Sequence, residues 1–137
     1  LETGAALSKF ADLVSVQGGD VEVARTPDNI LPSARCLEAV PSLHSGYVSS
    51  IDAERIGVAS MILGAGRKTK DDTIDPAAGI MVLKKIGHKV EQGEPLVMLH
   101  TNNWDTLEQA AQLVMSAYEI SRDKPDVPLL ITRVIEN

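Results

Sequence analysis

Cysteine, aromatic residues and positive charge are all scarce in this chain. The single cysteine, Cys36, excludes an internal disulfide and any metal site built from several cysteines, and it suits a reducing compartment. One Trp, two Tyr and one Phe offer little for base stacking on single-stranded nucleic acid. Thirteen Lys and Arg against nineteen Asp and Glu give a net charge of −6. This balance argues against nucleic acid or an anionic membrane as the main partner, because both attract a basic surface.

Long hydrophobic runs are also lacking. The longest weakly polar run, residues 56–66, is far shorter than the ~20 residues that a membrane-spanning helix needs. No basic segment precedes an apolar stretch at the start, so we expect no secretory signal. The 137 residues suffice for one domain with a real core. Because the chain begins at Leu1 and not at Met, we interpret it as a piece of a longer protein.

The first 34 residues differ from the rest in pattern. Residues 4–16 predict an amphipathic helix, with Leu7, Phe10, Ala11 and Val14 at helical spacing and glycines at 18 and 19 to end it. A short lone helix is marginal in water, so this one needs a surface on which to pack. Residues 21–34 contain two prolines and little periodicity, which indicates a linker or an extended connection.

From residue 35 onward the pattern predicts a mixed α+β fold with more strands than helices. The expected strands cover residues 36–40, 44–51, 79–83, 96–101, 118–121 and 129–135. A helix is expected over residues 53–63, with Asp52 as its N-cap and Gly64 and Gly66 at its end. A second helix follows the capping-box spacing of residues 105–108. Its apolar side comprises Leu107, Ala110, Ala111, Val114 and Tyr118.

The segment Gly64-Ala65-Gly66-Arg67-Lys68 suggests a phosphate-binding loop at first sight. Phosphate cradles lie at helix N-termini, where free N–H groups and the positive end of the dipole meet the anion. These glycines instead follow a predicted helix, where glycine is an ordinary C-terminal cap and nearby cations complement the dipole. We therefore favour the cap over a self-contained phosphate site, although the cations could reach an anion held by another domain.

No metal site or catalytic constellation is evident. Asp71, Asp72 and Asp75 lack the spacing of a calcium-binding loop, and a solvated loop with charges paired to neighbouring cations is the simpler interpretation. The three histidines, at 44, 88 and 100, fall in different segments without metal-ligand spacing. Cys36 is interpreted as a small buried hydrophobe. We accordingly assign no catalytic residue and no metal ligand.

Residues 84–100, KKIGHKVEQGEPLVMLH, look like half of a lipoyl or biotinyl domain. The shared pattern is a strand, a glycine turn, a valine, a second glycine and an apolar strand. Those domains carry their prosthetic group on a lysine in the hairpin that follows, and here the residues that follow, TNNWD, contain no lysine. The segment thus favours a barrel-sandwich type of β geometry and argues against a swinging-arm carrier, so no cofactor is expected.

Several linked motifs together resemble the C-terminal third of the pyrimidine-nucleoside phosphorylases, the group that includes thymidine phosphorylase. The longest is residues 63–80, LGAGRKTKDDTIDPAAGI, followed by KKIG at 84–87 and HTN at 100–102. Before it come SGYV at 45–48 and IGVA at 56–59. Still earlier, ALSKF at 6–10 and QGGD at 17–20 look like the end of the family's catalytic α/β domain.

The resemblance implies three segments: residues 1–20, the last helix of the catalytic domain; residues 21–34, a linker; and residues 35–137, the C-terminal domain. It implies an α+β fold of the β-hammerhead or barrel-sandwich-hybrid type with two packed helices. It also implies that the parent enzyme is a cytoplasmic homodimer that cleaves thymidine or uridine with inorganic phosphate as co-substrate. The family's phosphate- and base-binding motifs do not occur here, so the fragment alone is expected to be inactive.

Enzymes of this family close a helical domain onto the α/β domain. We hypothesise that a mixed-charge loop, with Arg67, Lys68, Lys70, Asp71 and Asp72, helps to lock the closed state across the domain boundary. The alternative is that this loop merely covers the core. A second interpretation of the whole chain also stays open, namely a free-standing binding or structural module without enzymatic activity.

Overall fold

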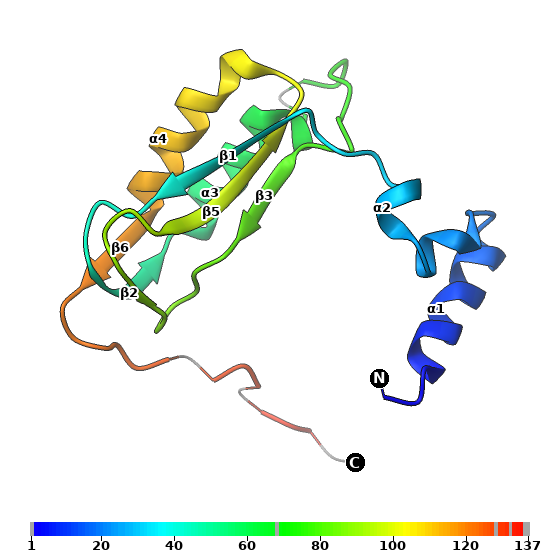
Figure 1. The fold of residues 1–137 in the computed structure, drawn as a ribbon, viewed down its shortest axis with the longest axis horizontal. Coiled ribbons are helices and arrows are strands. Elements are labelled where there is room, and N and C mark those ends of the chain that lie inside the picture. The colour runs from blue at the N-terminus through cyan, green and yellow to red at the C-terminus, as the bar shows by residue number, and fades with distance from the viewer. Residues whose placement is uncertain (1, 68, 128, 132, 136–137) are drawn as a thin grey trace. The chain divides into compact units, whose positions relative to one another are not determined.

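A computed structural model describes residues 2–67, 69–127, 129–131 and 133–135 of the chain. By its internal contacts the chain divides into two compact units, Leu1–Ser33 and Ala34–Asn137. Both units are drawn in Figure 1. The first is a small helical unit, and the second holds all six strands that the described residues form.

The first unit is built from one helix and two short helical turns. Helix α1 (Ala5–Val16) ends at Gly18, where φ is 77° and where the Gly18 N–H donates to Ser15 O at 3.0 Å. Turn η1 (Val21–Ala24) is capped by Asp20, whose Oδ1 accepts from the Glu22 N–H at 2.9 Å. Helix α2 (Pro27–Ile30) begins with a proline, as first helical turns often do. The expectation of an extended connection over residues 21–34 was therefore wrong in part, because local caps fold much of it into helical turns.

The second unit is an α+β domain, which confirms the predicted fold class. It has two three-stranded antiparallel sheets. Sheet A has the order β1-β5-β3, formed by Cys36–Pro41, Pro95–Thr101 and Gly79–Val82. These three strands lie side by side in Figure 1. Sheet B has the order β4-β2-β6, formed by Lys89–Val90, Gly46–Ile51 and Tyr118–Ser121.

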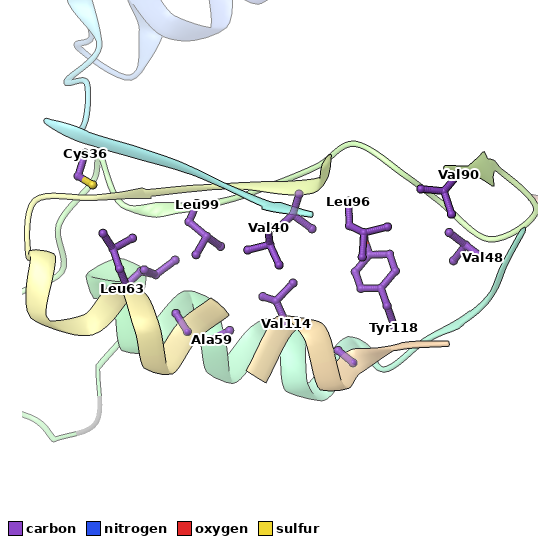
Figure 2. Close-up of a cluster of buried hydrophobic side chains, with 14 residues drawn as sticks. Cys36, Val40, Val48, Ala59, Leu63, Val90, Leu96, Leu99, Val114 and Tyr118 are labelled. Carbon is purple, nitrogen blue, oxygen red and sulfur yellow. The ribbon is translucent and has the colours of Figure 1, made fainter. Parts of the chain in front are cut away.

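Two helices pack against each other and cover one face of sheet A. Asp52 caps α3 (Ala53–Ser60), because its Oδ1 accepts from the Arg55 N–H at 3.1 Å. Helix α4 (Leu107–Ala117) follows a short turn, η3 (Trp104–Thr106). Arg55 joins the two helices, since its Nη1 donates to Ser116 O at 2.6 Å. Figure 2 shows both helices on the same side of the sheet, with the core side chains between the helices and the sheet.

The core is aliphatic and lies between sheet A and these helices. Leu63, Leu99, Val40 and Val114 are at most 2% exposed and point toward one another in Figure 2. At the other end, Val48 and Val90 from sheet B meet Leu96 and Tyr118. The Tyr118 hydroxyl donates to Lys84 O at 3.0 Å, so its one polar atom is satisfied. Burying this apolar surface is the main source of the domain's stability.

The helix predicted over residues 53–63 ends in an unexpected way. After Ser60 the backbone widens into a π-helical turn, η2 (Met61–Ala65), and Gly64 inside it has φ 114°. Only glycine adopts that backbone angle without strain. The glycines at 64 and 66 therefore terminate a helix, as predicted, and do not form the N-terminal cradle that a phosphate would need.

Two local predictions for this domain were wrong. Asn103, not Asp105, caps the segment that leads into α4, because Asn103 Oδ1 accepts from the Asp105 N–H at 3.2 Å. In residues 129–131 and 133–135, the described part of the predicted last strand, no strand forms. Its apolar side chains are largely exposed, from 69% at Ile131 to 100% at Leu130. An apolar, β-prone sequence forms a strand only where an edge accepts it, and no such pairing occurs for these residues.

We expect Leu99→Ala to lower the free energy of unfolding by about 2–5 kcal/mol, because Leu99 is fully buried in the middle of the central strand β5. Leu43→Ala is the matched control, since Leu43 is 59% exposed, and its effect should stay within about 0.5 kcal/mol. Denaturant unfolding followed by circular dichroism measures both. Equal effects of the two substitutions would contradict this location of the core.

Candidate functional site

The loop between η2 and β3 is closed at its base by one residue, Asp75, through its backbone N–H and its carboxylate. The Asp75 N–H donates to Gly64 O at 2.9 Å, which joins the two ends of the loop. Asp75 Oδ1 accepts from the Ala77 N–H at 2.9 Å, and Asp75 Oδ2 accepts from Asn102 Nδ2 at 2.8 Å. The loop therefore projects from a fixed base and not from a free hinge.

Asn102, the residue after β5, links this base to the start of the domain. Its Oδ1 accepts from the Arg35 N–H at 2.9 Å, while its Nδ2 holds Asp75. The preceding residue, Thr101, is fully buried, and its hydroxyl donates to Leu63 O at 2.8 Å. The end of β5 thus binds three segments at once: the residue before β1, the π-helical turn, and the end of the loop.

The tip of the loop is organised by Asp72. Its two carboxylate oxygens accept from the Thr69 N–H at 3.0 Å and from the Thr69 hydroxyl at 2.8 Å. Arg67, Lys70 and Asp71 are exposed, and among the described residues Arg67 and Lys70 form no ion pair. Lys68 lies outside the described residues. The structure thus ties Asp72 into the loop and leaves two of the predicted cations exposed.

Two of the three acidic residues of this loop, Asp72 and Asp75, accept hydrogen bonds. Asp72 and Asp75 bind Thr69, Asn102 and Ala77, as given above, and Asp71 is exposed. Within the described ranges, no group of three or more His, Cys, Asp and Glu side chains is arranged to hold a metal ion. The three histidines are dispersed, and Nε2 of His100 is enclosed without a hydrogen-bond partner among the described residues.

The thiol of Cys36 and the phenol of Tyr118 both lie in the hydrophobic core. Burial raises the pKa of the Cys36 thiol, and the nearby Glu38 carboxylate adds to that shift. Burial likewise raises the pKa of Tyr118. A thiol with a raised pKa is a poor nucleophile at neutral pH. These two groups therefore behave as parts of the core, in agreement with the interpretation of Cys36 as a hydrophobe.

Four ionic side chains gather in the segment that connects β3 to β5. Lys84 Nζ lies 3.2 Å from Glu94 Oε2, which also accepts from the Glu91 N–H at 2.7 Å. Lys89 Nζ lies 2.9 Å from Glu91 Oε1. The pKa of Glu94 is lowered, first by the backbone hydrogen bond from Glu91 and then by Lys84. The hydrogen bond from Lys89 is the largest cause of the lowered pKa of Glu91.

Asn102 and Thr101 are the residues of this site that sequence reasoning missed. They stood inside one of the quoted motifs, HTN at 100–102, but no role was given to them. Thr101 binds Leu63, which is 38 residues away in the sequence, and Asn102 binds Arg35, which is 67 residues away. No local sequence pattern could therefore identify these two residues. The loop residues predicted as a candidate site, by contrast, were chosen from a local pattern of charge.

These features define a class of protein: a small α+β domain with an anchored, charged loop, in which the described residues form no metal-binding cluster. The sequence profile of the pyrimidine nucleoside phosphorylase C-terminal domain matches residues 47–121, from β2 to the end of β6. The chain belongs to this family. The matched range contains the loop, Asn102 and both packed helices.

Individual relatives agree over almost the whole chain. A pyrimidine-nucleoside phosphorylase of Bacillus subtilis (strain 168) is 43% identical over 136 residues, which are 99% of this chain and 31% of the relative. Relatives of the same name from Staphylococcus epidermidis (strain ATCC 35984) and Staphylococcus aureus (strain bovine RF122) are 41% and 43% identical over 135 residues, each 98% of this chain and 30% of the relative. The chain therefore spans just under one third of the length of these curated relatives.

We expect Glu94→Gln to reduce stability at neutral pH and to lose that effect in acid. Because the folded-state pKa of Glu94 is lowered, its contribution is complete above the unfolded value near 4.5 and disappears as the pH falls through the folded value. The difference in unfolding free energy between wild type and variant should thus shrink toward zero below pH 4.5. Urea unfolding across pH measures it.

The control is Glu119→Gln, at an exposed carboxylate that forms no ion pair with a described residue. A Glu94→Gln difference that stays constant from pH 7 to pH 3 would show that the ionised carboxylate does not stabilise this segment.

Proposed function

We propose that this chain is the C-terminal, non-catalytic domain of a pyrimidine-nucleoside phosphorylase and that it contributes to domain closure and stability. The observation that carries the proposal is the family match across residues 47–121, supported by three relatives of that name at 41–43% identity. Residues 1–20 would then be the last helix of the catalytic domain, and residues 21–34 the connection. The two-sheet architecture would be of the β-hammerhead or barrel-sandwich-hybrid type.

The reaction proposed for the parent is the phosphorolysis of thymidine or uridine. Phosphate oxygen forms a bond to the anomeric carbon, the bond from that carbon to the base nitrogen breaks, and the products are free base and pentose 1-phosphate. Catalysis consists of positioning the two substrates and stabilising the developing charges on sugar and base. We assign these tasks to the remaining two thirds of the parent, since this chain offers no cluster of groups suited to them among its described residues.

The proposed partner of this domain is the rest of the same enzyme. The parent would be a cytoplasmic homodimer joined through its helical domain, with phosphate as co-substrate and no cofactor, nucleic acid or membrane partner. No helix formed by the described residues is both long and apolar enough to cross a bilayer. The residues on which we place the closure role are Arg67, Lys68, Lys70, Asp71 and Asp72. The closure role is supported by the fixed base of the loop at Asp75 and by the exposed cations at positions 67 and 70.

We expect the full-length parent to release thymine or uracil from its nucleoside only when phosphate is present, and residues 1–137 alone to release none. The physical reason is that this chain supplies no substrate-positioning groups. Absorbance or chromatography of the released base measures both. Turnover by the isolated chain would contradict a non-catalytic role, and an inactive parent would favour the alternative of a binding or structural module.

We expect the triple variant Arg67→Gln, Lys68→Gln and Lys70→Gln to lower kcat/KM of the parent by about tenfold or more, because loop contacts that hold the closed state are lost. Asn102→Ala should act in the same direction, since it removes the base anchor and keeps the charges. The control is Lys85→Gln with Lys124→Gln, two exposed cations outside the loop. Unchanged kcat and KM in the triple variant would contradict the closure role.

A further inference from the structure

One face of sheet A is largely apolar, and its outer strands are exposed. The strand register places Leu37, His100 and Gly79 in one row and Ala39, Met98 and Met81 in the next. Side chains alternate along a strand, so these six lie on the face opposite the buried core residues of the same strands. We call this set the open face of sheet A. It comprises Leu37, Ala39, Gly79, Met81, Met98 and His100.

Exposure on this face is highest on the two outer strands, β1 and β3, whereas Met98 and His100 on the central strand are half-buried. Leu37 is 60% exposed and Met81 is 55% exposed, although both are large and apolar. A Cβ added at Gly79 would meet no atom within 4 Å, so there is open space beside the first residue of β3. In contrast, Val97 and Leu99, which face the helices from the central strand, are fully buried. A contiguous apolar sheet face of this kind marks a surface for another protein segment.

We propose that the open face of sheet A is a docking surface for a domain of the parent enzyme that lies outside residues 1–137. This inference rests on the proposed function, and it goes further by naming the surface and its occupant. The relatives align over 98–99% of this chain but are about three times as long, so most of the parent is a further polypeptide of the same molecule. That polypeptide is the occupant to which the geometry points.

Chain connectivity favours this occupant over a separate molecule. Arg35 is fixed to Asn102, and β1 begins at the next residue, so the polypeptide arrives at one end of the open face. A covalently attached domain is present at a high effective concentration, and a modest apolar surface is then enough to hold it. A free partner would have to bind the same surface without that advantage.

The chemistry around the face also suits a protein surface. Its centre is apolar, with two methionines that adapt to an uneven partner. Its end carries polar groups, since Asn102 continues the alternation after Met98 and His100 and binds Asp75 there. The exposed cations Arg67 and Lys70 belong to the loop that Asp75 closes. An apolar centre with a polar border is the usual composition of an interface between protein domains.

Cysteine labelling of the full-length parent tests whether the face is covered. Leu37→Cys and Met81→Cys place a thiol on the open face, and Leu43→Cys places one at a control position that is equally exposed in the domain, 59% against 60% and 55%. We expect maleimide to modify positions 37 and 81 about tenfold or more slowly than position 43, as read peptide by peptide by mass spectrometry. The buried Cys36 is measured in the wild type as background. A ratio below about fivefold would overturn the proposal.

Photo-crosslinking identifies the occupant. Position 39 lies on the open face and is exposed, so Ala39→p-benzoylphenylalanine places a photoreactive group there with little internal disturbance. We expect crosslinks within one chain to peptides of the parent outside residues 1–137. Crosslinks between two copies would instead make the face a subunit contact, and the absence of any crosslink would show it to be bare. Either result overturns the proposal.

The same preparations are assayed for phosphorolysis, which separates this inference from the function on which it rests. An active parent whose open face is freely labelled contradicts only the docking surface. A parent with a protected face that does not cleave nucleosides contradicts only the proposed activity.

Discussion

Two neighbouring side chains at the end of β5 link the core, the charged loop and the start of the domain. Thr101 faces inward and donates to Leu63 O, and Asn102 faces outward and binds both Asp75 and Arg35. Because successive strand residues point to opposite faces, one dipeptide can anchor structure on both sides of a sheet. The buried threonine hydroxyl satisfies a backbone carbonyl that is shielded from water, and the asparagine amide can accept from one group and donate to another at the same time.

The position of this anchor gives it wide influence. Strand β5 is central in sheet A, with β1 and β3 both paired to it, and its inner face carries core residues such as Val97 and Leu99. The anchor thus connects the buried core to the charged loop and to the uncovered face of the sheet. We propose that these two outer features contact other domains of the parent enzyme; the core and those contacts would then depend on the same few hydrogen bonds.

Sequence patterns predicted the local parts of this fold and missed its long-range parts. The helix cap at Asp52, the glycine termination at Gly64 and five of the six expected strands follow from propensity and spacing. The strand expected at 129–135 failed because pairing needs an available edge, which no propensity encodes. Asn102 could not be identified, since its partners lie 27 and 67 residues away. The charged loop was recognised, but not that Asp75 fixes its base.

The hydrogen bond between Arg35 and Asn102 has a mechanical consequence. Among the described residues of this domain, Arg35 is the first whose backbone is fixed to the β-structure, one residue before β1 begins. Tension in the chain that precedes it is therefore borne first by the Asn102 amide, and Asn102 is also the side chain that holds Asp75 and the base of the loop. The incoming chain and the base of the loop are both bonded to the side chain of Asn102, so a force on the chain is transmitted to the loop through that single side chain.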